Sequence, residues 1–211
     1  MDPLPLSMPG TRPVYAGFWI RLAASLIDSV ILVPLLLLID FFQRASLTLS
    51  LATALPVAVL FMLYEVGFNA WYGGTIGKIV VGIRIARLDG SPIGWNEALL
   101  RSSVYIGFAC IMQAANYDVL LHVDAAQYER MSLTEWVQYM QQNQPIWGML
   151  ADKMETAWFW SEFVVLLLNE RKRAIHDFIA GTVVIYADFV RSPVDTDAVA
   201  PIDFSRAPYA G

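Results

Sequence analysis

Charged and sulfhydryl side chains are scarce in this sequence. Asp, Glu, Lys and Arg make up 16% of the 211 residues, against about 25% in a typical soluble domain. The net charge of −5 argues against nucleic acid as a partner, because surfaces that bind nucleic acid carry excess positive charge. A single cysteine, Cys110, excludes an internal disulfide.

The sequence also lacks the residue sets that common catalytic and metal sites require. Its two histidines, His122 and His176, fall on opposite sides of the membrane in the topology predicted below, so we expect no metal and no cofactor. No Ser–His–Asp or Cys–His set shares one side of that topology. We therefore expect that the protein is not an enzyme.

Long apolar runs are what the sequence does contain, with 57% hydrophobic residues. A bilayer core about 30 Å thick needs about 20 helical residues. Four segments approach this length and predict an all-α membrane protein, with four transmembrane helices in one bundle. They cover residues 18–39, 51–71, 98–115 and 150–168.

Lysine and arginine indicate the orientation of these helices. Most of the 14 basic residues fall before the first span, between the second and third, or after the fourth, whereas Arg44, Arg130 and Lys153 fall on the other side. The positive-inside rule therefore places both termini in the cytoplasm. We expect a cytoplasmic segment 1–15, a transmembrane domain 16–188 and a disordered cytoplasmic tail 189–211.

The predicted outer segment, residues 116–149, is acidic and lies between the third and fourth spans. Its stretch SLTEWVQYMQQ has the spacing of an amphipathic helix, which we expect to lie at the membrane interface.

A small β element is predicted on the cytoplasmic side. In KIVVGIRIARLDG, apolar residues at every second position predict a strand near 79–87, ended by the turn at Asp89 and Gly90. The β-branched stretch TVVIYAD predicts a second strand over 182–188. We expect the two strands to pair, because a lone strand would leave backbone groups unpaired near lipid.

The run WYGGTIGKIVVG fails the phosphate-loop pattern, which would need glycine at position 72 and Ser or Thr at position 79. A local interpretation is that Gly73 and Gly74 end the second helix and Thr75 caps a short helix. Lys78 and Arg84 are candidates for binding an anion or a lipid headgroup at this site.

Two charged residues interrupt the first apolar run. Arg21 lies at its start and Asp28 near mid-membrane, where an acid costs about 2.5–3.5 kcal/mol on insertion scales. They share a helix face but stand about 10 Å apart along the axis, so each needs a partner from elsewhere. We predict that Arg21 pairs with Asp177 as an electrostatic clamp at the cytoplasmic interface.

Asp28 has several candidate partners. It could form a hydrogen bond with Ser25, or face Glu65 of the second span or Glu162 of the fourth. Two neighbouring carboxylates in low dielectric do not both ionise easily, so one would bind a proton near neutral pH, as in a proton-coupled site. The alternative is that these acids are neutral, hydrogen-bonded links between helices.

Three stretches carry a family resemblance: GFWIRLAASLIDSVIL, YEVGFNAWYGGTIGKIVVGIRIARLDGSPIGWNEALLRS and NERKRAIHDFIAGTVVI. In order and spacing they resemble the RDD family of bacterial membrane proteins, named for one arginine and two aspartates. By this resemblance Arg21 is the family arginine, and Asp28 and Asp177 are the two aspartates. The resemblance implies an inner (plasma) membrane protein and, as suggested for the family, transport that includes cation/proton exchange.

The leading hypothesis is therefore a proton-linked cation transporter, or a component of one, with Asp28 as the titrating group. Its expected partners are the lipid bilayer, a small cation and a proton. Four helices are few for alternating access, so we also expect a homo-oligomer or a membrane-protein partner.

The alternative hypothesis is a membrane scaffold that does not transport. In that case the acidic outer segment binds another protein, with Trp136, Tyr139 and Trp147 as aromatic anchors.

Overall fold

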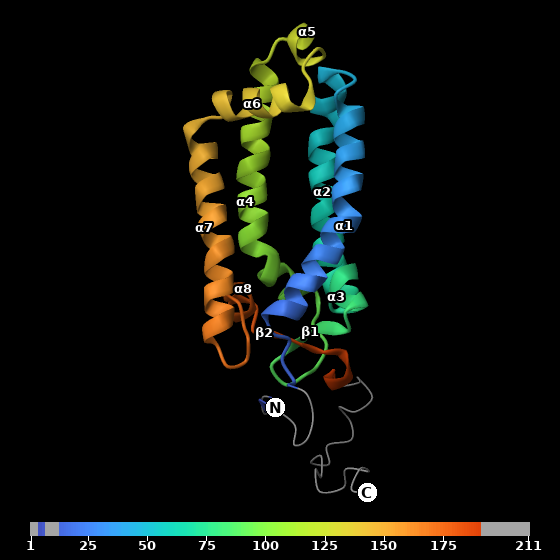
Figure 1. Ribbon diagram of the computed structural model, residues 1–211, viewed down its shortest axis with the longest axis vertical. Helices are drawn as coiled ribbons and strands as arrows, with labels where there is room; N and C mark the ends of the chain where they lie inside the picture. Colours follow the sequence, from blue (N-terminus) through green and yellow to red (C-terminus); the bar gives the residue numbers. More distant parts are fainter. Residues whose placement is uncertain (1–3, 7–12, 191–211) are drawn as a thin grey trace, which may run out of the picture.

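The computed structural model describes residues 4–6 and 13–190 of the chain. These residues are mostly helical, and a two-stranded sheet lies at one end of the long helices (Figure 1). Within the described residues, three helical stretches are long and apolar enough to cross a membrane: Phe18–Gln43, Leu47–Val80 and Trp95–His122. The prediction of a helical membrane protein with a small β element is confirmed at this level.

The fourth predicted span corresponds to helix α7, Ile146–Leu168, with 23 residues. Its length suffices for a bilayer core. However, Asp152, Lys153, Glu155 and Glu162 make it too polar to join the three apolar stretches.

The long helices run further than the apolar pattern predicted. Helix α1 (Phe18–Gln43) turns back into α2 (Leu47–Tyr72), whose first turn is capped by the Ser46 hydroxyl accepting from the Leu49 amide. Helix α4 (Trp95–His122) packs between α2 and α7. Hydropathy marks only the lipid-facing part of each helix, so its polar end turns escape the pattern.

The end of the bundle away from the sheet is covered by two short helices, α5 (Ala125–Tyr128) and α6 (Leu133–Asn143) (Figure 1). Helix α6 is the amphipathic helix predicted from the sequence, and Ser132 and Glu135 form a reciprocal cap at its start. The first residues of the predicted outer segment 116–149 belong to α4, which continues as helix to His122.

The predicted pairing of the two strands is confirmed. Strand β1 (Ile83–Arg87) runs antiparallel to β2 (Thr182–Tyr186), with Ile85 opposite Val184. On its other edge β2 is bonded to the chain before α1, where the Ala16 amide donates to the Val184 carbonyl at 2.9 Å. Both edges of β2 are therefore paired.

The strand limits differ from the prediction at both ends. Residues 79–82 do not belong to β1, because the short helix α3 (Ile76–Val80) occupies the first of them. Gly82 then turns the chain with φ +74°, a conformation that suits glycine. After β2, Ala187–Phe189 form a 3-10 turn, so the second strand ends at Tyr186 rather than at 188.

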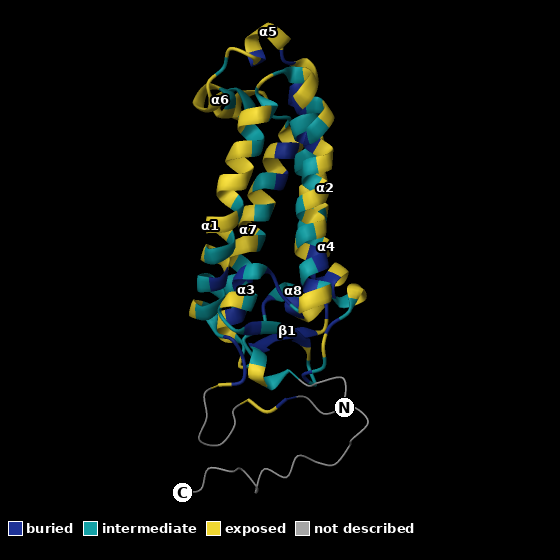
Figure 2. Cartoon of the chain, turned by 90° about the vertical axis from the view of Figure 1, so that its right-hand side faces the viewer, coloured by how far each residue is buried: buried dark blue, intermediate teal, exposed yellow. Residues whose placement is uncertain are grey.

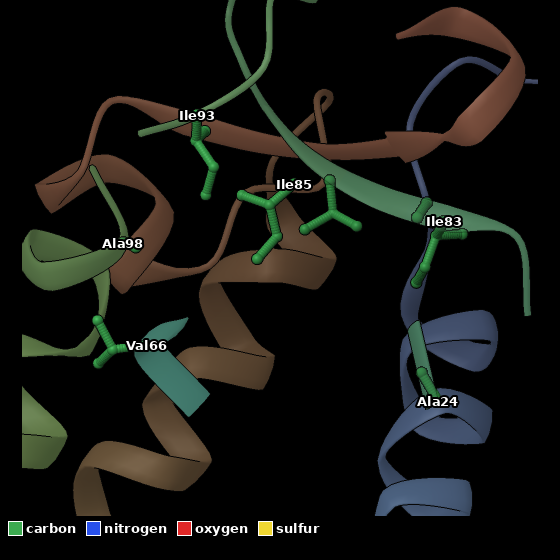
Figure 3. Packing of buried hydrophobic residues seen from close by; sticks show 8 residues of the cluster. Ala24, Val66, Ile83, Ile85, Ile93 and Ala98 are labelled. Carbon is green, nitrogen blue, oxygen red and sulfur yellow. The ribbon is translucent and has the colours of Figure 1, made fainter. Parts of the chain in front are cut away.

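Buried residues gather at the sheet end of the molecule, whereas the long helices expose apolar side chains over much of their length (Figure 2). The largest core cluster joins the sheet to the helices through Ala24, Val66, Ile83, Ile85 and Ala98 (Figure 3). An aqueous protein rarely exposes apolar surface over whole helices. The exposed parts of α1, α2 and α4 are therefore the lipid-facing surface, and the sheet end anchors the helices.

The predicted terminal segments fall partly outside the described residues. Of the predicted tail, only Phe189 and Val190 are described, and of the predicted N-terminal segment 1–15, only residues 4–6 and 13–15 are.

Candidate functional site

A cavity of about 280 Å³, lined by both apolar and charged side chains, lies at the sheet end of the bundle, between α1, α4, α7 and the short helix α8 (Ile175–Ile179). We call it the inner cavity. Its wall is closed on one side by Phe18 of α1 and Phe163 of α7, whose ring centroids are 5.3 Å apart. Its polar lining consists of Arg21, Ser25, Glu65, Lys78, Arg101, Tyr105, Glu162 and His176.

Asp177 lies directly behind this cavity and is completely buried. Its carboxylate accepts from Arg21 Nη1 at 2.9 Å, and it also forms an ion pair with Arg101 of α4. The Ala174 amide and the Thr182 hydroxyl complete its shell at 2.9 and 3.3 Å. The two guanidinium groups hold the pKa of Asp177 well below its usual range despite the burial, so this carboxylate is charged.

The predicted contact between Arg21 and Asp177 is thus present. Arg21 also donates to the backbone carbonyls of Ala16 and Lys172, so one guanidinium joins the start of α1 to the turn after α7. Whether this arrangement acts as a clamp during a transport cycle stays a prediction.

Arg101 is the residue that the sequence analysis missed. It falls inside the predicted span 98–115 without an assigned role, yet its side chain is 7% exposed and shares Asp177 with Arg21. The sequence held a signal for this role. An arginine inside an apolar helix needs a carboxylate partner, just as Asp28 needs a hydrogen-bond donor.

Glu162 and His176 form a second close contact on the cavity wall. His176 Nδ1 lies 2.6 Å from Glu162 Oε2, and the His176 backbone amide donates to Glu162 Oε1 at 3.2 Å. Burial, reinforced by the charge of Arg101, lowers the pKa of His176. The neutral imidazole is therefore the favoured form of His176.

Asp28 of α1 is bonded to groups of α2 and of the start of α3. Its carboxylate accepts from Thr75 Oγ1 at 2.6 Å, from the Gly77 amide at 2.7 Å and from the Tyr64 hydroxyl at 3.3 Å. Among the described residues, its partners include neither Ser25 nor another carboxylate. The Ser25 carbonyl accepts from the Ser29 hydroxyl. Of the alternatives, the hydrogen-bonded link between helices is the one that these contacts match, whereas a pairing of Asp28 with another acid is absent from the described residues.

The physical reason lies in the start of helix α3. The first amides of a helix have no partner within it, and a carboxylate is the natural acceptor for them. Asp28 fills this role from α1, while Thr75 directs its hydroxyl to Asp28 instead of capping α3 itself. A Cβ on Gly77 would overlap the Ala24 carbonyl and lie 2.9 Å from Asp28 Cγ, so only glycine permits this approach.

Glu65 differs from the other acids of the bundle. It lies on α2 and lines the inner cavity. In the described part of the chain, neither a hydrogen bond nor a salt bridge joins its carboxylate, although Lys78 is close enough to interact with it electrostatically. It is therefore the carboxylate of the cavity best placed to accept a proton or a cation.

Lys78 and Arg84, the anion or headgroup candidates, both lie beside the Gly73–Gly74 turn but do not line the same cavity. Lys78 lines the inner cavity, whereas Arg84 is absent from its lining and donates to the neighbouring Ile83 carbonyl at 2.9 Å. Binding of an anion or a lipid headgroup by these two residues stays a prediction.

The aromatic residues assigned to partner binding are largely engaged within the chain. Trp136 and Tyr139 stack on each other, with ring centroids 5.8 Å apart, and pack against the cluster around Leu120 and Tyr128. Trp147 stays about half exposed. The first two residues hold α6 on the end of the bundle.

The chain belongs to the RDD family, whose sequence model matches residues 15–181. It is similar to "Uncharacterized protein YckC" of Bacillus subtilis (strain 168), with 30% identity over 173 residues that cover 82% of this chain and 85% of the relative. It also resembles "Uncharacterized membrane protein YteJ" of the same organism, with 20% identity over 186 residues and 84% of each chain covered. No solved structure matches the chain.

Proposed function

We propose that this RDD protein is a non-enzymatic, proton-linked cation transporter, or a component of one, in the inner membrane. One observation carries the proposal: Glu65 lies in a membrane-spanning helix, faces the inner cavity and has no hydrogen bond or salt bridge in the described part of the chain. A carboxylate in a membrane is costly without a counter-ion or a proton. Cation and proton can therefore compete for this group.

The proposed topology has four spans and both termini in the cytoplasm. Helix α7 is long enough for a fourth span and packs along α4. The charged residues of α7 that disfavour a lone span lie at its α6 end or, as Glu162 does, against the cavity. The positive-inside rule then assigns the sheet end to the cytoplasm, where Arg171 and Lys172 lie beside β2 and the start of α1.

The division of roles follows from the contacts. Glu65 is the exchanging carboxylate, and the contact of Glu162 with His176 offers a second place for the proton. Arg21 and Arg101, bound to their shared counter-ion Asp177, form a fixed group that keeps this end of the bundle closed around the cavity. Asp28, our first candidate for the titrating group, instead positions α3 and, through it, Lys78.

A second copy of the chain or another membrane protein is part of this proposal. Alternating access needs two bodies that move against each other. In this chain the four long helices are tied together at the sheet, and an oligomer would supply the second body.

The test is cation-driven proton movement in vesicles that contain the purified protein. Glu65→Gln keeps the size of the side chain and removes its charge, and it should abolish the pH change that follows a pulse of Na⁺ or K⁺. Glu170→Gln is the matched control, because Glu170 lies in the turn after α7 and does not line the inner cavity. Flux that survives Glu65→Gln would exclude this function.

A further inference from the structure

A second cavity, of about 560 Å³, lies between α2 and α4 on the side of the bundle that carries α6. We call it the outer cavity. It runs from Gln144 and Glu155, near the α6 end, to Glu65 and Tyr105. Glu65 and Tyr105 also line the inner cavity, so the two cavities meet at this pair of residues.

The charges of the two cavities are different. The inner cavity presents Arg21, Lys78 and Arg101 together with its carboxylates. Among the described residues, the lining of the outer cavity contains no Lys, Arg or His, and its two charged groups, Glu65 and Glu155, are both acids. A recess with low-dielectric walls and only negative charge concentrates cations.

The uncharged lining of the outer cavity suits the same ligand. Ser102 is 3% exposed, and its hydroxyl oxygen has no hydrogen-bond partner in the described chain. The Gln113 amide nitrogen is likewise buried without a partner, and Asn116 and Gln144 add further amides. Turning an amide presents its oxygen instead of its nitrogen. Hydroxyl, amide and carboxylate oxygens are the ligands that small hard cations prefer.

We propose that the outer cavity is the external binding site for a small hydrated cation, with Glu155 at its mouth and Glu65 and Tyr105 forming the junction with the inner cavity. Buried polar atoms without partners belong to hydrated or liganded sites, because a dry site leaves their desolvation cost uncompensated. This proposal rests on the proposed function for one point, the exchange of cation and proton at Glu65. It adds the route of entry and the residues that select charge.

Chemical labelling tests the cavity without using transport. Cys110 is the only cysteine, so Cys110→Ser gives a background in which Gln113→Cys is the single thiol. Two membrane-impermeant methanethiosulfonates, one carrying trimethylammonium and the other sulfonate, are added from the outside. We expect the cationic reagent to react faster, by at least about tenfold relative to the rates of the two reagents with free cysteine.

Charge variants connect this preference to Glu155. Glu155→Gln should reduce the cationic preference severalfold, whereas Asp152→Asn, one turn earlier on the same helix and absent from the cavity lining, should leave it unchanged. In the flux assay, Glu155→Gln should raise the cation concentration for half-maximal flux about fivefold, with an unchanged maximal rate.

Three results would overturn the inference: equal rates for the two reagents, no reaction at Gln113→Cys from the outside, or a preference that Glu155→Gln does not alter. Each of them leaves the proposed function standing if Glu65→Gln still abolishes flux. Conversely, loss of the function with a preserved cationic preference would identify a binding site without transport.

Discussion

The substitution Asp177→Asn provides the sharpest test of the structure. Asp177 is completely buried and accepts from two guanidinium groups, one backbone amide and one hydroxyl. Asparagine preserves the shape of the side chain and one acceptor oxygen. It removes the single negative charge that Arg21 and Arg101 share, and it turns an amide donor toward one of them.

The expected cost is large because both arginines lose their shared counter-ion inside the protein. Removal of one partner of a buried ion pair destabilises a protein by about 3–5 kcal/mol. In a chain of this length, about 1 kcal/mol shifts the melting temperature by about 2–4 °C. We therefore expect Asp177→Asn to lower the melting temperature in detergent by about 6–20 °C, measured by tryptophan fluorescence.

Asp40→Asn is the matched control. Asp40 pairs with Arg44 at 2.7 Å, but its side chain is 36% exposed, and such pairs contribute at most about 1 kcal/mol. The double substitution Asp177→Asn with Arg101→Gln should recover part of the lost melting temperature, because it also removes the Arg101 charge that Asp177→Asn leaves without a counter-ion. If Asp177→Asn shifted the melting temperature no more than Asp40→Asn, the role assigned to this buried group would be refuted.

Three further predictions follow from the contacts around the inner cavity. Gly77→Ala should lower the melting temperature by several degrees, because the new methyl group overlaps the Ala24 carbonyl, whereas Ala24→Gly, which adds no atoms, should cost about 1 kcal/mol. Asp28→Asn should destabilise the protein by about 1–3 kcal/mol, the cost of weakened bonds to the start of α3, yet retain cation-driven flux in vesicles; loss of flux in a stably folded variant would return Asp28 to the exchange site. Burial lowers the pKa of His176, so the unfolded chain binds a proton on this side chain at a higher pH than the folded protein does. The free energy of unfolding should therefore be full above pH roughly 6.5 and fall below it, by at most about 1.4 kcal/mol per pH unit. His176→Gln should remove this slope in melting curves recorded between pH 5 and pH 8.

The sequence predicted those features that depend on local pattern or on a simple charge balance. Apolar runs located α1, α2 and α4, alternation located β1, a β-branched stretch located β2, and the need of each buried charge for a partner brought Arg21 to Asp177. These inferences succeed because the membrane penalises every unpaired group, and few partners of opposite charge are available.

The missed features depend on how helices approach each other. Asp28 bonds the start of α3 because Gly77 lets that helix lie against Ala24, a fit that spacing within α1 does not reveal. Similarly, residues 79–82 alternate like a strand, but a short apolar run fits helix and strand equally well, and Gly82 decides the limit. The meeting of two cavities at Glu65 is also a property of packing rather than of sequence.

The position of β2 has a consequence for how the protein is made. Its two edges are bonded to β1 and to the chain before α1, and β2 itself is among the last elements to be synthesised. During translation, the first three long helices are therefore made before β2, the strand that pairs with both β1 and residues 14–16. Contacts of such large sequence separation form late and slowly. A chain interrupted after α7 would therefore leave the edges of β1 and of residues 14–16 unpaired, and such edges mark an incomplete protein for aggregation or degradation.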